Sequence, residues 1–89
     1  MPSTDITISN KLGLHARAAA KLTQMAGRFE SEIYIARGKQ RVNAKSIMGV
    51  MMLAAGMGVT VVVDAEGPDA NEALEQIRQL FDSRFGESE

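Results

Sequence analysis

The sequence predicts an α+β fold, an open-faced β-sandwich in which a four-stranded antiparallel sheet is covered on one face by three helices. Four short segments alternate polar and apolar residues or are rich in β-branched residues, and two longer segments space their apolar residues by three and four. A short apolar segment adds a third helix and gives the order β-α-β-β-α-β-α. Residues 1–89 contain neither a repeat nor a linker, so we expect a single domain.

The first strand and the first helix are predicted on either side of a glycine-containing turn. Residues 5–9 alternate polar and apolar side chains, residues 10–14 form the turn, and helical spacing is clear from Ala18. Gly27 lies near the expected end of the helix. The apolar positions of this helix are Ala18, Leu22, Met25, Ala26 and Phe29, and its opposite face carries Arg17, Lys21, Gln24 and Arg28.

A β-hairpin and a short helix are predicted next. Residues 32–37 and 40–43 have strand character, and Gly38 supplies the tight turn between them. Ser46 precedes the apolar segment 47–53 and is a favoured helix N-cap, because its hydroxyl can accept a hydrogen bond from an exposed N–H of the first turn. A short helix on an open sheet buries only one side, so part of this segment is expected to be exposed.

The last strand and the last helix complete the predicted fold. Residues 59–64 are the clearest strand in the chain, and residues 67–69 form a turn. Asp69 is expected to cap the helix, with Glu72 three residues later in the manner of a capping box. The predicted helix carries its apolar residues at Ala70, Ala73, Leu74, Ile77, Leu80, Phe81 and Phe85.

The composition excludes several classes of site. The chain has no cysteine and a single histidine, so a cysteine-based zinc site and a histidine-rich metal site are excluded. We expect no metal and no cofactor. No segment approaches the roughly 20 apolar residues that span a bilayer, and the N-terminus lacks the pattern of a signal peptide. We therefore expect a cytoplasmic protein without membrane insertion.

His15, the single histidine, is the strongest candidate for chemistry. It lies where the turn gives way to the first helix, and Arg17 follows two residues later. The unpaired N–H groups of a helix start favour an anion and disfavour imidazolium, so the ring would be a neutral nucleophile. Residues 11–45 carry a net charge of +6, which would steer an acidic or phosphorylated partner toward this side. These features suggest a phosphoryl group carried on nitrogen.

Two motifs resemble the signature sites of the histidine-containing phosphocarrier protein (HPr) family of the bacterial phosphoenolpyruvate-dependent phosphotransferase system. They are Leu-Gly-Leu-His-Ala-Arg at 12–17 and Lys-Ser-Ile-Met-Gly at 45–49. The resemblance covers essentially the whole chain. One departure is Ala18, where many family members have proline. Alanine is compatible with the first turn of a helix, so this departure bears on the assignment to a subfamily and not on the transfer chemistry.

The resemblance implies a phosphocarrier rather than an enzyme. His15 would accept a phosphoryl group on Nδ1, giving pros-phosphohistidine, from phosphorylated enzyme I and pass it to enzyme IIA-type domains in sugar uptake or regulation. Arg17 would neutralise the phosphoryl oxygens. The sugar and nitrogen-related branches of the system use the same histidine chemistry, so the choice between them stays open, and a monomer is expected.

The resemblance also implies a regulatory site and a docking surface. Ser46 would be phosphorylated by an HPr kinase/phosphorylase where the host has one; the plain alternative is that it only caps the helix. Partner docking is expected on the side chains of Ile47, Met48, Met51, Lys21 and Lys45. We expect Val50 and Leu53 to fill the core instead.

The main competing function is a small basic-faced module that binds RNA or protein without phosphotransfer. The chain has only four aromatic residues, three of them on predicted core faces, so it lacks a stacking platform for RNA bases. The sequence pI of about 5.8 also disfavours nucleic acid as a partner.

Overall fold

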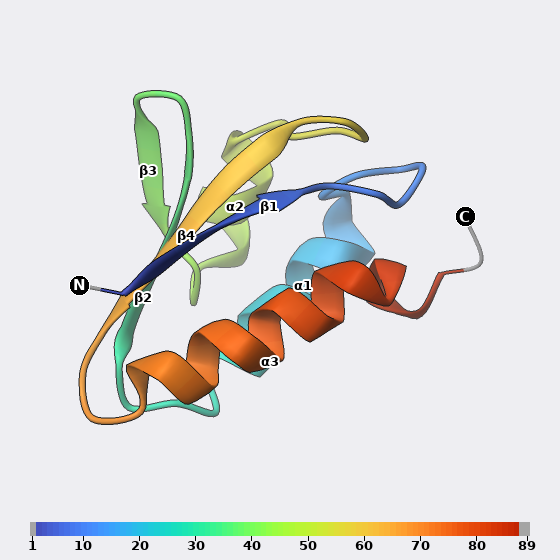
Figure 1. Ribbon diagram of the computed structural model, residues 1–89. Helices are drawn as coiled ribbons and strands as arrows, with labels where there is room; N and C mark the ends of the chain where they lie inside the picture. The colour runs from blue at the N-terminus through green and yellow to red at the C-terminus, as the bar shows by residue number, and fades with distance from the viewer. Residues whose placement is uncertain (1, 88–89) are drawn as a thin grey trace.

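The computed structural model describes residues 2–87, and Figure 1 shows its elements in chain order. The predicted order β-α-β-β-α-β-α is confirmed, with a short 3-10 helix, η1, added at the end. The elements are β1 (Ser3–Thr7), α1 (Ala16–Ala26), β2 (Glu32–Arg37), β3 (Gln40–Asn43), α2 (Ile47–Met52), β4 (Thr60–Glu66), α3 (Ala70–Asp82) and η1 (Arg84–Gly86).

The four strands form one antiparallel sheet in the order β1-β4-β2-β3. In its register Thr7 lies opposite Thr60, and Tyr34 lies opposite both Asp64 and Asn43. The predicted turn at Gly38 is also confirmed, since β2 and β3 pair directly on either side of it and its φ is +59°.

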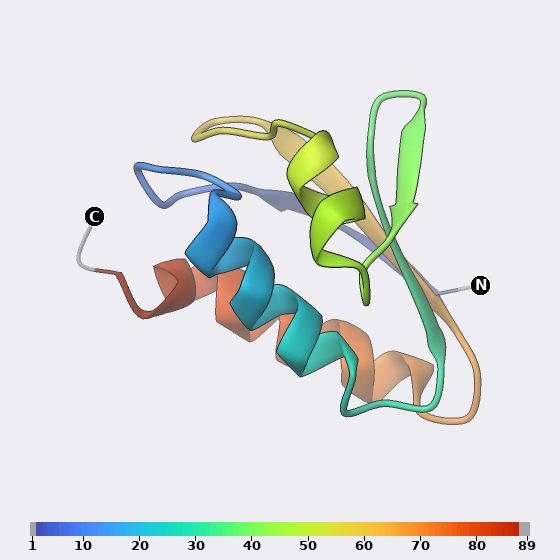
Figure 2. The same ribbon diagram turned by 180° about the vertical axis from the view of Figure 1, so that it is seen from behind.

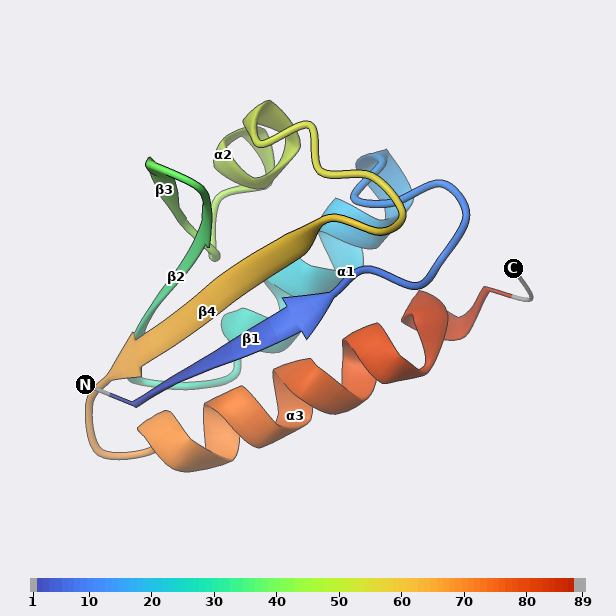
Figure 3. The ribbon, with the colours of Figure 1, turned by 45° about the horizontal axis from the view of Figure 1, so that its top comes forward.

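The helices lie on one face of the sheet, as Figure 3 shows for α1 and α3. The helix α3 packs on β1 and β4, α1 packs against α3 and α2, and α2 contacts β3. The open-faced sandwich predicted from the sequence is therefore confirmed. Alternation along the strands puts the buried side chains between sheet and helices. The largest of these are Phe81, Phe85, Ile8, Leu22, Ile33, Ile35, Leu53 and Ile77.

The bounds of two strands differ from the prediction by two residues. The structure begins β1 at Ser3 rather than residue 5 and ends β4 at Glu66 rather than residue 64. The reason is pairing, because Ser3 lies opposite Asp64 of β4, and Glu66 lies opposite Glu32 of β2. Ile8 lies beyond β1 but remains tied to the loop before β4, donating to the carbonyl of Val59 at 2.9 Å.

Asp69 is the N-cap residue of α3, as predicted, but the predicted capping box is wrong. The Asp69 carboxylate makes no cap bond to α3. It accepts instead from the backbone N–H groups of Glu30 and Ser31, each at 3.0 Å, and from the Ser31 hydroxyl at 2.5 Å. A side chain of a type that often caps helices bonds here to a loop 38 residues away, which fastens the end of α1 to the start of α3.

The predicted extent of the last helix is also wrong, because α3 ends at Asp82 rather than continuing to Phe85. Arg84 and Phe85 adopt positive φ values of 57° and 56°, so the chain leaves the path of the helix. The turn brings the buried Phe85 ring edge-on to Phe81, with ring centroids 4.8 Å apart. The segment after α3 is thus directed toward the start of α1, where Lys21 contacts Phe85 and His15 contacts Glu87.

Replacing Asp69 by asparagine is expected to make the free energy of unfolding depend less on pH in the acid range. Hydrogen bonds from the Ser31 hydroxyl and the Glu30 N–H lower the pKa of Asp69 below its usual value of about 3.9. The carboxylate therefore stabilises the fold above that pH, and the contribution disappears as pH falls through the lower, folded-state pKa.

Urea unfolding between about pH 2 and pH 7 measures this effect. Asp69→Asn should be less stable than the wild type at neutral pH and should converge with it in acid. Asp82→Asn, at an exposed position near the end of α3, serves as the control. A constant difference between wild type and Asp69→Asn at all pH values would contradict the assignment.

Candidate functional site

His15 lies at the start of α1, as the sequence predicts. It is the N-cap residue, with extended backbone and no cap bond from its side chain. Its carbonyl accepts from the N–H of Ala19 at 2.8 Å, while the N–H groups before Ala19 in the first turn lack intrahelical acceptors, as at any helix start. The side chain is 27% exposed, so a partner can reach the ring. The electrostatic setting favours a negatively charged group beside it.

The nearest partner of His15 is Glu87, which sequence reasoning missed. Glu87 Oε2 lies 2.5 Å from His15 Nε2, and Glu87 Oε1 accepts from Asn10 Nδ2 at 3.1 Å. Asn10 is fully buried and also donates to the carbonyl of Gly13 at 2.9 Å. Two parts of the chain, the segment 10–15 and the C-terminal turn, therefore form one hydrogen-bonded cluster.

The Glu87 carboxyl group is ionised at neutral pH. Hydrogen bonds from His15 and then from Asn10 lower the pKa of Glu87 below its usual range. An ionised carboxylate only accepts hydrogen bonds, so the Nε2–H of His15 is the donor in this contact. In neutral imidazole the other nitrogen, Nδ1, then carries the lone pair.

The loop that carries His15 is fixed against the segment after α2. Gly13 has φ +63°, and a Cβ there would come within 2.6 Å of the backbone of Ala55 and Gly56. Leu14 donates to the carbonyl of Ala55 at 2.9 Å. Glycine is required because the two backbones touch and the left-handed conformation disfavours other residues.

The other predicted phosphate residue, Arg17, lies in the first turn of α1 and is exposed. Within residues 2–87 no hydrogen bond or ion pair engages its guanidinium group. Ser46 caps α2 as predicted, accepting from the N–H of Gly49 at 3.1 Å. In Figure 2, α2 is the short yellow-green helix, and the chain segments that precede and follow it lie at its two ends.

The predicted docking side chains on α2 are exposed. Met48 is 71% exposed, while Val50 and Leu53 are buried as expected. Exposed apolar residues also occur in the loop before α1 and in the segment after α2, which the contact of Gly13 with Ala55 brings together. The apolar patch consists of Leu12, Ile47, Met48, Met51, Met52 and Met57, of which Leu12, Met52 and Met57 were not predicted.

The two lysines predicted for docking have internal partners. Lys21 Nζ donates to the carbonyl of Phe85 at 2.5 Å, and Lys45 Nζ donates to that of Phe29 at 2.9 Å. Lys21 therefore fastens the C-terminal turn that carries Glu87. Arg41, another member of the predicted basic half, pairs with Asp64 at 2.7 Å and stacks on Tyr34. The basic residues thus do not all converge on His15.

The roles of Glu87 and Asn10 could not be predicted from the sequence, because both depend on a contact between distant parts of the chain. Glu87 lies 72 residues from His15 along the chain. The one available clue was Gly86 after the apolar Phe85, since a glycine there marks a break in the helical pattern.

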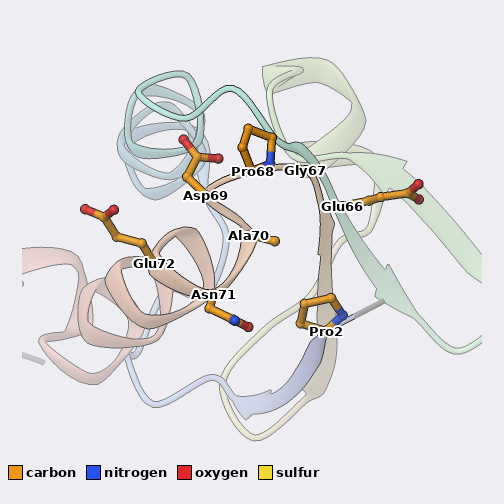
Figure 4. A pocket seen from close by; sticks show the side chains of 8 residues that line it. All are labelled: Pro2, Glu66, Gly67, Pro68, Asp69, Ala70, Asn71 and Glu72. Carbon is orange, nitrogen blue, oxygen red and sulfur yellow. The ribbon is translucent and has the colours of Figure 1, made fainter.

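A pocket of about 530 Å³ lies at the other end of α3 and holds none of the predicted site residues; Figure 4 shows its lining. It is lined by Pro2, Glu66, Gly67, Pro68, Asp69, Ala70, Asn71 and Glu72. Over residues 2–87, no three acidic or histidine side chains gather as metal ligands would. None of the helices described is long and apolar enough to cross a membrane.

Known proteins resemble this chain in both sequence and structure. The family model described as the PTS HPr component phosphorylation site matches residues 2–83. The chain is 57% identical to the phosphocarrier protein HPr of Cupriavidus necator over 89 residues, with both chains fully covered. It is 47% identical over 83 residues to the phosphocarrier protein NPr of Shewanella violacea, covering 93% of this chain and 91% of the relative.

A solved structure agrees with these relatives. The crystal structure of HPr-C-His from Thermoanaerobacter tengcongensis superposes with a TM-score of 0.96 at 45% identity, covering 100% of each chain. The family match, the similarity to these relatives and the shared fold agree with one another. This chain belongs to the HPr family and is a phosphocarrier of the phosphotransferase system.

Proposed function

We propose that residues 1–89 act as one monomeric, cytoplasmic carrier unit that takes a phosphoryl group on His15 Nδ1 from phosphorylated enzyme I and delivers it to enzyme IIA-type domains. The observation that carries this proposal is the contact of Glu87 with His15 Nε2, because it leaves Nδ1 as the ring nitrogen with a lone pair. The family supplies the phosphocarrier role, and the site supplies the acceptor atom.

In the proposed transfer, the Nδ1 lone pair attacks phosphorus and the bond from phosphorus to the donor breaks. Nε2 keeps its proton, which stays hydrogen-bonded to Glu87. Arg17, which is exposed in the first turn of α1, would neutralise phosphoryl oxygens. The N–H groups at the start of α1 favour the added negative charge. Because the chain is itself modified and then restored, it acts as a carrier rather than as a catalyst on small molecules.

The experiment that tests this function is phosphorylation by a purified enzyme I. With phosphoenolpyruvate and magnesium, the intact mass should rise by one phosphoryl group per chain, and acid should remove it. Adding an enzyme IIA domain should return the unmodified mass. A chain that stays unmodified with an enzyme I that phosphorylates another HPr would contradict the proposal.

The role of Ser46 in regulation stays a prediction. Its hydroxyl is exposed and accepts a hydrogen bond at the start of α2. A phosphate there would be electrostatically compatible with the helix start and would add negative charge beside the apolar patch. Phosphorylation of Ser46 would therefore weaken the docking of acidic partners.

Replacing Met48 by glutamate is expected to slow transfer from enzyme I about tenfold when enzyme I is below saturation. Met48 is the most exposed member of the apolar patch, so a charge there would have to be desolvated when a partner docks. Unfolding free energy should change by less than about 0.5 kcal/mol, as for other surface substitutions.

Steady-state transfer assays compare Met48→Glu with Asn71→Glu, which adds the same charge at an exposed position near the start of α3. Only the first variant should be slow. Equal rates for both variants and the wild type would show that the apolar patch is not a docking surface.

A further inference from the structure

We infer that Asn10 and Glu87 together select the ring nitrogen of His15 that attacks phosphorus. This inference rests on the proposed function and adds two positioning residues to it. Neither residue needs to touch the phosphoryl group. Their effect is on which of the two neutral forms of the imidazole is present before a partner arrives.

The selection begins at a backbone carbonyl. The oxygen of Gly13 can only accept, so the group of Asn10 that faces it at 2.9 Å is the Nδ2 amide nitrogen. The same nitrogen donates its second hydrogen to Glu87 Oε1 at 3.1 Å. Asn10 Oδ1 is buried and has no partner within residues 2–87, which costs free energy. The amide thus keeps both N–H bonds although its oxygen goes unpaired.

The orientation of Asn10 fixes the hydrogen-bonding role of Glu87, and Glu87 in turn fixes that of His15. Asn10 presents only N–H to Glu87, so Glu87 must accept there. With that carboxylate ionised, its second oxygen also accepts, and His15 Nε2 must donate. The neutral ring therefore carries its hydrogen on Nε2 and its lone pair on Nδ1. No step in this sequence depends on a charge on the histidine.

The carboxylate is held in place by the C-terminal turn. Phe85 is buried in the core, and its carbonyl accepts from Lys21 Nζ at 2.5 Å. The same lysine lies near enough to contribute to lowering the pKa of Glu87. The buried Phe85 ring and the Lys21 ammonium group hold this turn, and the turn keeps Glu87 next to His15. The tautomer of His15 is therefore set before a partner docks.

The substitution Glu87→Gln tests the inference because it keeps the shape of the side chain but replaces the acceptor that faces His15 with a donor. Asn10 still presents N–H, so the oxygen of the introduced amide must face Asn10 and its NH₂ group must face His15. His15 Nε2 then becomes the acceptor, and the hydrogen moves to Nδ1. We expect the population with a free Nδ1 lone pair to fall about tenfold, the effect of one hydrogen bond, and the phosphorylation rate to fall with it.

The form of the ring is read from its ¹⁵N shifts by long-range ¹H–¹⁵N correlation at about pH 8.5, where imidazoles are neutral. The wild type and the control Glu72→Gln, at an exposed position in α3, should show hydrogen on Nε2. Glu87→Gln should show it on Nδ1. Hydrogen on Nε2 in folded Glu87→Gln, with a wild-type rate, would overturn the inference.

The double variant N10D/E87Q tests Asn10 itself. The buried carboxyl group that it introduces at position 10 stays protonated, donates to Gly13 and accepts from the NH₂ group of the amide at position 87. The oxygen of that amide then faces His15, and Nε2–H returns. A folded double variant that keeps hydrogen on Nδ1 would overturn the role of Asn10; if it does not fold, Glu87→Gln decides. These spectra need no partner, so failure of enzyme I to phosphorylate the wild type would overturn the proposed function alone.

Discussion

His15→Ala is expected to abolish phosphorylation by enzyme I completely. The chain has one histidine and no cysteine, and Nδ1 of that histidine is the only ring nitrogen in the site with a free lone pair. Alanine removes the nucleophile, and neither Arg17 nor Glu87 can replace it as an acid-labile carrier. The measurement is the intact mass after incubation with phosphoenolpyruvate, magnesium and enzyme I.

The loss must be chemical rather than structural. The His15 side chain makes no cap bond to α1, and its pair with Glu87 is partly exposed, so its removal should cost less than about 1 kcal/mol of stability. Thermal unfolding of the variant checks this. An acid-labile phosphoryl group that persists on folded His15→Ala would mean that the acceptor lies elsewhere.

Phe81→Ala is expected to lower the free energy of unfolding by about 3–5 kcal/mol, the usual cost of removing a buried aromatic ring. Phe81 is 1% exposed and packs edge-on against Phe85. A small domain has only about 5–15 kcal/mol in total, so the melting temperature should fall steeply, by roughly 4–8 °C for each kcal/mol.

The same substitution should also disturb the site from a distance. Phe85 loses its ring partner, so the C-terminal turn that holds Glu87 against His15 should loosen. Urea unfolding with Gln79→Ala as control measures the stability, since Gln79 is exposed on the same helix and should change it by about 0.5 kcal/mol or less. Equal losses in both variants would contradict the packing role of Phe81.

The fold could be predicted from the sequence because each element carries a local signal. Alternation indicated the strands, three- and four-residue spacing indicated the helices, and Ser46 correctly marked the start of α2. The failures share one cause. Asp69 is a favoured capping residue by type, yet its carboxylate bonds to Ser31 across the fold, a choice that tertiary packing makes.

The site was predicted in part for the same reason. His15 and Arg17 stand together in one motif, so the sequence alone singles out both residues, and their roles with phosphate stay predictions. Glu87 could not be found in this way, because helical spacing carries the pattern on to Phe85 while the actual chain leaves the path of the helix after Asp82. The turn depends on burying Phe85 and on positive φ values that no local preference favours.

The identity of the phosphorylated ring nitrogen tests the central claim that His15 Nδ1 accepts the phosphoryl group. Protein labelled with ¹⁵N on histidine, phosphorylated by enzyme I and held at alkaline pH, is examined by NMR for coupling between phosphorus and each ring nitrogen. We expect one phosphoryl group bonded to Nδ1 of His15 and no coupling of phosphorus to Nε2. Coupling of phosphorus to Nε2 would contradict the proposed site.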